Sequence, residues 1–289
     1  MVFYIDDKMN EQSKNFELNF QNRIVSKIDE KTYQYIIELQ QQIKNTQMTL
    51  PHFWDLSNSI NQYDELFINY YSYLLTNRKL SKSQLFQDLF VLYFLKNKKN
   101  GTFLEFGATN GIELSNSFTL EHDFQWQGVL AEPSPQWHEQ LKKNRPKSTI
   151  ITECIYSETG KNLDFFVSDQ GVLSTLEEFK NSDISSMPGN TKARNERGYN
   201  HKVTTISLND VFIKYFNCVA IDYMSVDTEG SELMILENFD FGRFSPKIVT
   251  VEHNFTEAQC KLDELFFKNN YSRVFKEHTQ FDAWYILNK

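Results

Sequence analysis

The sequence has no long apolar run, few cysteines and no excess of positive charge, and each absence excludes a class of protein. The longest obvious apolar run, residues 90–95, is far shorter than the roughly 18 residues that a membrane-spanning helix needs. No basic segment followed by an apolar stretch opens the chain, so a secretory signal is not expected. We therefore expect a cytoplasmic protein with no membrane span.

The cysteines and the net charge narrow the partners further. Cys154, Cys218 and Cys260 are widely spaced, which suits neither a disulfide framework nor a C-x-x-C metal site. The formal net charge is -8 at pH 7, whereas loose binding to nucleic acid requires clustered Lys and Arg. We expect a small-molecule substrate and no nucleic acid.

Two regions of the 289-residue chain differ in pattern. Between residues 15 and 45, apolar side chains recur at three- and four-residue steps, which is typical of an amphipathic helix. An aromatic-rich stretch at residues 62–75 is also predicted to be helical. We interpret residues 1–80 as a helical arm, with homo-oligomerisation as one role for it, and residues 81–289 as the catalytic domain.

The catalytic region begins with a helix that Ser81 or Ser83 is expected to cap and that ends near Lys96. After Gly101, short apolar runs alternate with helical segments, a pattern typical of βαβ units and a mainly parallel sheet. The expected strands cover residues 102–106, 127–131, 148–152, 163–167, 223–227 and 247–252, followed by a closing hairpin of residues 271–275 and 283–287. Residues 168–202 show little periodicity and are too long for an ordinary connection, so we expect a lid or substrate loop there.

The strongest local signal is an apolar strand that runs into Gly107 and Gly111, with Glu105 near its end. Glycines let a ligand approach the backbone where a strand ends, and Glu105 is placed to accept a bond from a ligand amino group. Glu132 follows the next apolar run, where a carboxylate commonly binds ribose hydroxyls. The G-x-G-x-x-G fingerprint of a dinucleotide site is absent, which argues against NAD.

Five segments in this order resemble the FkbM methyltransferases, over about residues 81 to 289. They are Ser83-Gln84-Leu85-Phe86-Gln87-Asp88, Glu105 to Gly111, Ser115-Asn116-Ser117, Trp126-Gln127-Gly128 with Glu132-Pro133, and Asp227-Thr228-Glu229-Gly230-Ser231-Glu232. Ser117 stands where the family often has Thr, and Glu105 where Asp is also common.

The resemblance implies S-adenosylmethionine as the cofactor and a Rossmann-like α/β class I methyltransferase fold. Its sheet is expected to have seven mostly parallel strands, the last of them antiparallel. The residues expected to bind the cofactor are Gln84, Asp88, Glu105, Gly107, Ala108, Asn110, Gly111, Glu132 and Tyr156. The adenine site near Cys154, Ile155 and Tyr156 rests on strand order, and core packing is an equal alternative for the last two.

Two neighbouring parallel strands end in Asp227-Thr228-Glu229 and Glu252-His253-Asn254, so these residues are expected to converge on one crevice. The set resembles the metal site of catechol O-methyltransferase, with His253 in place of its middle Asp. We expect Asp227 and His253 to be catalytic and to bind a divalent metal with Asn254 and Glu229; one imidazole among oxygen ligands suits Mn or Fe(II) better than Mg. The alternatives are His253 as a metal-free general base, or purely structural roles.

A basic cluster lies inside the expected loop, at Lys192, Arg194, Arg197 and His201. Such a cluster suits a diphosphate, as in a nucleotide-activated sugar, although a solvated charged face is an alternative. The FkbM resemblance implies O-methylation of a sugar-like hydroxyl, for example in surface polysaccharide synthesis. Two rivals remain: another Rossmann-like nucleotide-sugar enzyme, and a non-catalytic assembly subunit.

Overall fold

The computed structural model describes residues 65–288, and the chain divides after Thr76 into two units. Helix α4 (Glu65–Asn77) overlaps the helical stretch expected at residues 62–75. The amphipathic helix expected between residues 15 and 45, and with it most of the proposed arm, lies outside the described residues. Within the described part of the chain, no helix is long and apolar enough to cross a membrane.

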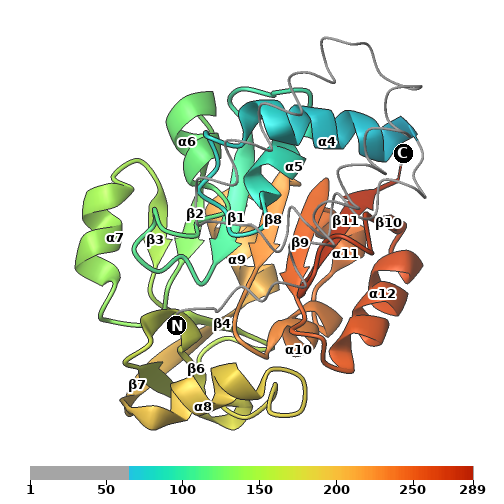
Figure 1. The fold of residues 1–289 in the computed structure, drawn as a ribbon. Coiled ribbons are helices and arrows are strands. Elements are labelled where there is room, and N and C mark those ends of the chain that lie inside the picture. The colour runs from blue at the N-terminus through green and yellow to red at the C-terminus, as the bar shows by residue number, and fades with distance from the viewer. Residues whose placement is uncertain (1–64, 289) are drawn as a thin grey trace. The chain divides into compact units, whose positions relative to one another are not determined.

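The second unit is built around a seven-stranded sheet of strand order β10-β11-β9-β8-β1-β2-β3 (Figure 1). Its strands are β1 (Thr102–Phe106), β2 (Gln127–Ala131), β3 (Thr149–Ile151), β8 (Tyr223–Val226), β9 (Ile248–Glu252), β10 (Tyr271–Val274) and β11 (Asp282–Leu287). Pairing is parallel from β3 across to β9, whereas β11 is antiparallel to both of its neighbours. The predicted Rossmann-like sheet with an antiparallel last strand is confirmed.

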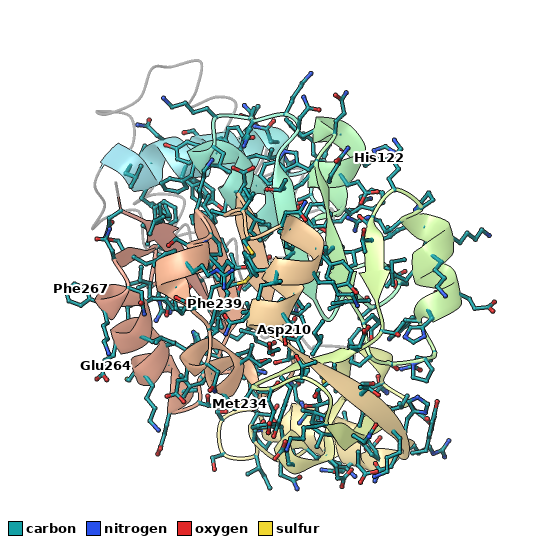
Figure 2. The ribbon with its side chains drawn as sticks, turned by 180° about the vertical axis from the view of Figure 1, so that it is seen from behind. His122, Asp210, Met234, Phe239, Glu264 and Phe267 are labelled. Atoms are coloured by element: carbon teal, nitrogen blue, oxygen red, sulfur yellow. The ribbon has the colours of Figure 1, made fainter. Side chains whose placement is uncertain are left out.

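Alternation along the strands decides which side chains meet the helices on each face. Leu104, Met224 and Val249 belong to one large apolar cluster, together with side chains from four helices. These helices are α9 (Leu208–Phe216), α10 (Glu232–Glu237), α11 (Phe241–Phe244) and α12 (Ala258–Lys268). Figure 2 shows α9, α10 and α12 nearest the viewer, in front of the sheet. The intervening residues of the central strands, Glu105 and Ser225 among them, point to the opposite face.

Helices α5 (Gln87–Phe94), α6 (Phe118–Phe124) and α7 (His138–Asn144) also belong to this unit. Helix α5 begins later than expected, because Phe86 adopts a left-handed conformation with φ of 66°. Ser83 nevertheless contributes to its first turn, since its Oγ accepts a hydrogen bond from the Asp88 amide at 3.1 Å.

Residues 154–207 build a second sheet, which takes in residues 168–202, where the sequence predicted an irregular lid or substrate loop. Its strands are β4 (Cys154–Tyr156), β5 (Asn162–Ser168), β6 (Thr175–Leu176) and β7 (Gly198–Ser207), in the order β4-β7-β5-β6. Two 3-10 turns, η2 (Gly171–Leu173) and η3 (Glu177–Phe179), and helix α8 (Pro188–Glu196) fill the interval between β5 and β7. Figure 1 shows this inserted segment below the carboxyl edge of the main sheet. The strand expected at residues 163–167 therefore exists as β5, but in the second sheet.

Candidate active site

A cavity of about 400 Å³ lies where the carboxyl ends of β1, β2, β8 and β9 meet the inserted segment. From the sheet side, Gly107, Glu132 and Asp227 line it, and from the inserted segment Val172 and Met187 do so. Its lining includes six acidic side chains and, among the described residues, no Lys or Arg. The acids are Glu113, Glu132, Asp227, Glu229, Glu252 and Asp282. The cavity therefore suits a ligand that carries positive charge.

The turn after β1 brings bare backbone to the cavity wall. Gly107 has φ of +65°, and a Cβ at this position would lie 2.5 Å from the carbonyl oxygen of Asp227, so only glycine fits. Gly107 and Ala108 line the cavity. Asn110 and Gly111 lie behind them: the Asn110 Oδ1 accepts the Ile112 amide at 2.9 Å, and Gly111 packs on Arg145. They shape the turn rather than face a ligand.

Glu132, directly after β2, is 3% exposed and lines the cavity. Its two carboxylate oxygens accept the Thr109 amide at 2.7 Å and the Ser134 amide at 2.8 Å. Burial raises the pKa of Glu132 to about 7, against the lowering effect of these two amides. The amides fix the carboxylate, and each oxygen keeps a lone pair for a ligand hydroxyl.

Glu105 does not face a ligand amino group, which is the role that the sequence suggested for it. It is 3% exposed and is not part of the cavity wall. One oxygen accepts the Asn116 amide at 2.7 Å, and the other accepts the hydroxyls of Ser115 and Ser117. Burial raises the pKa of Glu105, while the nearby Arg145 guanidinium lowers it. Glu105 thus fixes the segment between β1 and α6.

The two other residues expected at the amino-acid end of the cofactor lie in different places. Gln84 lines the cavity. Asp88 is fully buried outside it, where it accepts the Ser81 hydroxyl at 2.6 Å and the Lys82 amide at 3.1 Å. Asp88 therefore holds the segment that precedes α5 in place.

On the expected adenine side, Cys154 and Ile155 of β4 line the cavity, whereas Tyr156 does not. The Tyr156 hydroxyl instead donates to Glu178 at 2.9 Å, in an exposed position. Burial raises the pKa of the Cys154 thiol to about 12, so this side chain contributes a neutral, apolar wall.

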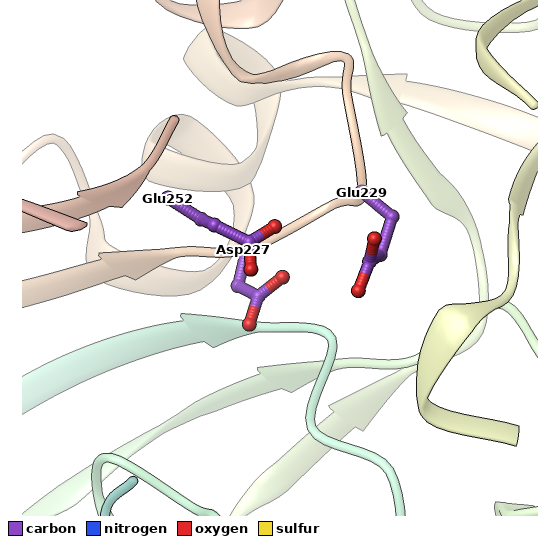
Figure 3. A group of neighbouring side chains, drawn as sticks. All are labelled: Asp227, Glu229 and Glu252. Carbon is purple, nitrogen blue, oxygen red and sulfur yellow. The ribbon is translucent and has the colours of Figure 1, made fainter. Parts of the chain in front are cut away.

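Asp227, Glu229 and Glu252 bring carboxylate oxygens within 4.8 Å of one another (Figure 3). Burial and the repulsion of neighbouring carboxylates, Glu229 and Glu232 among them, raise the pKa of Asp227 and of Glu252 well above the usual range. The pKa of Glu229 rises to about 7 through burial, although the Arg194 guanidinium opposes the rise. The Asn254 side chain lines the same cavity and donates to Glu252 at 2.9 Å. We call these three acids the carboxylate trio.

His253 does not join this trio, contrary to its predicted role as ligand or base. Its Nδ1 accepts the Phe255 amide at 3.0 Å, which leaves Nε2 to donate to the carbonyl oxygen of Asp282 at 3.0 Å. Burial and the Arg273 guanidinium lower the pKa of His253 to about 4. With both ring nitrogens occupied, His253 anchors the end of β9 to the start of β11, and Glu252 occupies the cavity position expected for it.

The basic cluster predicted to hold a diphosphate is not assembled at the cavity. Arg194 is fully buried and pairs with Asp183 at 3.0 Å and with Glu229 at 2.6 Å. Lys192, Arg197 and His201 are exposed, and none of the three lines the cavity. Arg194 is therefore not available to bind a substrate. Through its ion pairs it joins the inserted segment to the carboxylate trio, and we call this pair of contacts the Arg194 clamp.

These residues fit S-adenosylmethionine, the cofactor that the sequence motifs imply. The Gly107 turn provides a cradle that any Cβ would fill, Glu132 offers oxygens for ribose hydroxyls, and the acidic wall matches a sulfonium and an ammonium group. The sheet order and this site define a Rossmann-like methyltransferase that depends on S-adenosylmethionine.

The chain belongs to the FkbM methyltransferase family, since residues 105–284 match the methyltransferase FkbM domain. No curated protein matches the chain. The solved structures that are similar to this chain include a putative caffeoyl-CoA O-methyltransferase from Staphylococcus aureus. It has 13% sequence identity and a TM-score of 0.40, and the match covers 83% of this chain and 100% of that chain. Precorrin-6y C5,15-methyltransferase from Geobacter metallireducens GS-15 has 11% identity, a TM-score of 0.39 and coverage of 72% and 89%.

Proposed function

We propose that the protein transfers the methyl group of S-adenosylmethionine to a hydroxyl oxygen of a small, sugar-like acceptor. The observation that carries this proposal is the carboxylate trio, which shares one cavity with Gly107 and Glu132. Methyl transfer to oxygen is an in-line displacement, so the enzyme must align the oxygen with the methyl group and exclude water. Carboxylates at the strand ends are suited to hold and orient hydroxyl groups.

A hydroxyl is a weak nucleophile unless its proton is accepted, and the trio supplies that acceptor. A carboxylate whose pKa is raised is a stronger base than an ordinary one, and burial raises the pKa of both Asp227 and Glu252. The carboxylate oxygens of these two residues lie within 4.8 Å of each other, so a proton held by one of them relieves the repulsion between them. One proton between them leaves Asp227 or Glu252 able to take the proton of the acceptor.

The trio also fits a divalent cation, because three carboxylates within 4.8 Å, with Glu229 buried and Asp227 and Glu252 half-buried, form a hard, oxygen-only donor set. Without His253, this set favours Mg or Mn over a metal that prefers imidazole. Asp227, Glu229 and Glu252 would hold the ion, and when bound it would lower the pKa of a ligated hydroxyl.

The charge of the cavity favours an acceptor without phosphate. The described lining offers six acids and no Lys or Arg, while the exposed basic residues of the inserted segment lie outside it. A diphosphate there would face carboxylates without a cationic partner among these residues. We therefore favour an uncharged sugar hydroxyl over a nucleotide-activated sugar.

Incubation with methyl-labelled S-adenosylmethionine and matched acceptors tests the proposal. Each matched set holds a free sugar, its 1-phosphate and its nucleotide diphosphate derivative, and mass spectrometry detects methyl gain. We expect transfer to the free sugar, its loss in Asp227→Asn, and its retention in Glu264→Gln, which removes an exposed acid outside the cavity.

Chelator treatment separates the two ways of activating the hydroxyl. Loss of transfer with recovery on adding Mg or Mn supports the metal, and unchanged transfer supports the carboxylate base. Methyl gain only in the phosphorylated members would contradict the charge argument. Methyl gain on nitrogen or carbon would contradict O-methylation.

A further inference from the structure

The segment that Glu105 fixes carries a polar side chain to the cavity wall. Asn116 is 8% exposed and lines the cavity. Its backbone amide donates to Glu105 at 2.7 Å, and its Nδ2 donates to the Ser225 hydroxyl at 2.9 Å. Both ends of Asn116 are therefore held by neighbouring strands of the sheet.

The remaining amide atom has no partner. The Asn116 Oδ1 is buried, and no described residue donates a hydrogen bond to it. A buried carbonyl oxygen without a donor costs free energy that a bound donor returns. Nδ2 is the amide atom that faces the Ser225 hydroxyl, and Oδ1 is therefore the atom that remains for a ligand donor.

We propose that Asn116 Oδ1 accepts a hydrogen bond from the α-ammonium group of S-adenosylmethionine. The cofactor has donors on its adenine, its ribose and its amino-acid end. Glu132 lies after β2, whereas Asn116 is tied to β8, which flanks β1 on the side away from β2. With the ribose at Glu132, the donor that reaches the β8 side is the ammonium group.

This assignment divides between two residues the role of binding the ligand amino group, which the sequence suggested for the Glu105 carboxylate. Glu105 is the positioning residue, since its three hydrogen bonds hold Ser115, Asn116 and Ser117 in place. Asn116 is the residue that contacts the cofactor. A neutral amide oxygen serves this contact without adding a further carboxylate to a wall that already holds six.

Calorimetric titration of the full chain with two ligands tests the proposal without any acceptor. S-adenosylhomocysteine carries the amino-acid end, whereas 5′-methylthioadenosine lacks it and keeps the adenosine. Asn116→Ala should weaken S-adenosylhomocysteine by about 10- to 100-fold, the size expected for a hydrogen bond to a charged group, and leave 5′-methylthioadenosine within about twofold.

Two matched variants separate ligand contact from local structure. Ser225→Ala removes the same side-chain bond but keeps the Asn116 oxygen, so its affinity for S-adenosylhomocysteine should fall by less than about threefold. Asn116→Asp keeps an acceptor oxygen and should also stay within about threefold of the wild type. Thermal melts establish that each variant is folded.

An analogue of S-adenosylhomocysteine with hydrogen in place of the amino group allows a double-mutant-type cycle between Asn116 and the ammonium group. It should bind the wild type as weakly as S-adenosylhomocysteine binds Asn116→Ala, and lose nothing further in that variant. Equal losses for S-adenosylhomocysteine and 5′-methylthioadenosine, or wild-type affinity in Asn116→Ala, would overturn the assignment. Failure of the wild type to bind S-adenosylhomocysteine would instead overturn the cofactor site itself.

Discussion

Replacing Glu132 with alanine is the most direct test of the cofactor site. The carboxylate is held by two backbone amides at 2.7 and 2.8 Å and lines the cavity, so its loss removes the expected partners of two ribose hydroxyls. Hydrogen bonds to a charged acceptor contribute about 1.5–3 kcal/mol each, and water that refills the site returns part of this. A net loss of about 2–4 kcal/mol corresponds to about 30- to 800-fold weaker binding of S-adenosylhomocysteine.

The affinity should also depend on pH, in a direction that the structure fixes. Burial raises the pKa of Glu132 to about 7 in the free protein, whereas ribose hydroxyls donate to the ionised form and lower the pKa in the complex. Binding is therefore tightest above pH 7 and weakens as the pH falls below 7, where a proton must first be released. The raised pKa of Glu132 also makes the free energy of unfolding of the free protein fall as the pH rises from about 4.5 to about 7. In this range the folded protein still holds the Glu132 proton, whereas the unfolded chain has released it.

Calorimetry from pH 5.5 to 8.5 checks both effects. Glu132→Ala should bind weakly and with a flatter pH profile, while Glu264→Ala, which removes an exposed acid outside the cavity, should stay within about threefold of the wild type. Wild-type affinity in a folded Glu132→Ala protein would refute the ribose assignment. An unchanged pH profile in that variant would assign the titration to another group.

Three further predictions follow from the contacts of the site. Asp227→Ala should abolish binding of Mn²⁺ as followed by electron paramagnetic resonance, whereas His253→Gln should retain it; the reverse result would restore the imidazole as a ligand. Arg194→Met should lower the free energy of unfolding in denaturant by about 3–5 kcal/mol, since it strands two buried carboxylates, and a loss under about 1 kcal/mol would contradict the clamp. Gly107→Ala should cost about 1–3 kcal/mol of stability and weaken S-adenosylhomocysteine, because its Cβ meets a carbonyl oxygen at 2.5 Å and φ is positive; Gly189→Ala, whose Cβ meets nothing within 4 Å, is the control and should be neutral or slightly stabilising.

The sheet was predictable from the sequence because its strands are apolar runs buried by helices on both sides. Even the closing hairpin was expected, and β10 and β11 lie within one residue of its predicted bounds. The inserted segment was not predictable in the same way. The first half of β7 is exposed and polar, and its partner β5 lies far earlier in the chain, with Phe165 opposite His201. No hydrophobic pattern within either strand indicates that these two strands pair.

Within the site, strand alternation separates Glu252 from His253. Ser225 pairs with Thr250 in the parallel register, so Asp227 and Glu252, each two residues further on, share a face. His253 belongs to the other face and turns toward β11. This signal was available in the sequence, whereas the burial of Arg194 was not, because its partner Glu229 comes from outside the inserted segment.

The position of β11 has a consequence for how the chain reaches its native state. This last strand of the sequence lies between β9 and β10, in the interior of the sheet, and Asp282 at its start receives a hydrogen bond from Gln87 across 195 positions. Contacts of such large sequence separation slow folding, because loop-closure entropy must be overcome before they form. Until β11 docks, β9 and β10 lack the strand between them, His253 lacks its anchor, and the cavity lacks the Asp282 carboxylate. The acquisition of cofactor binding during refolding should therefore report the arrival of the final strand.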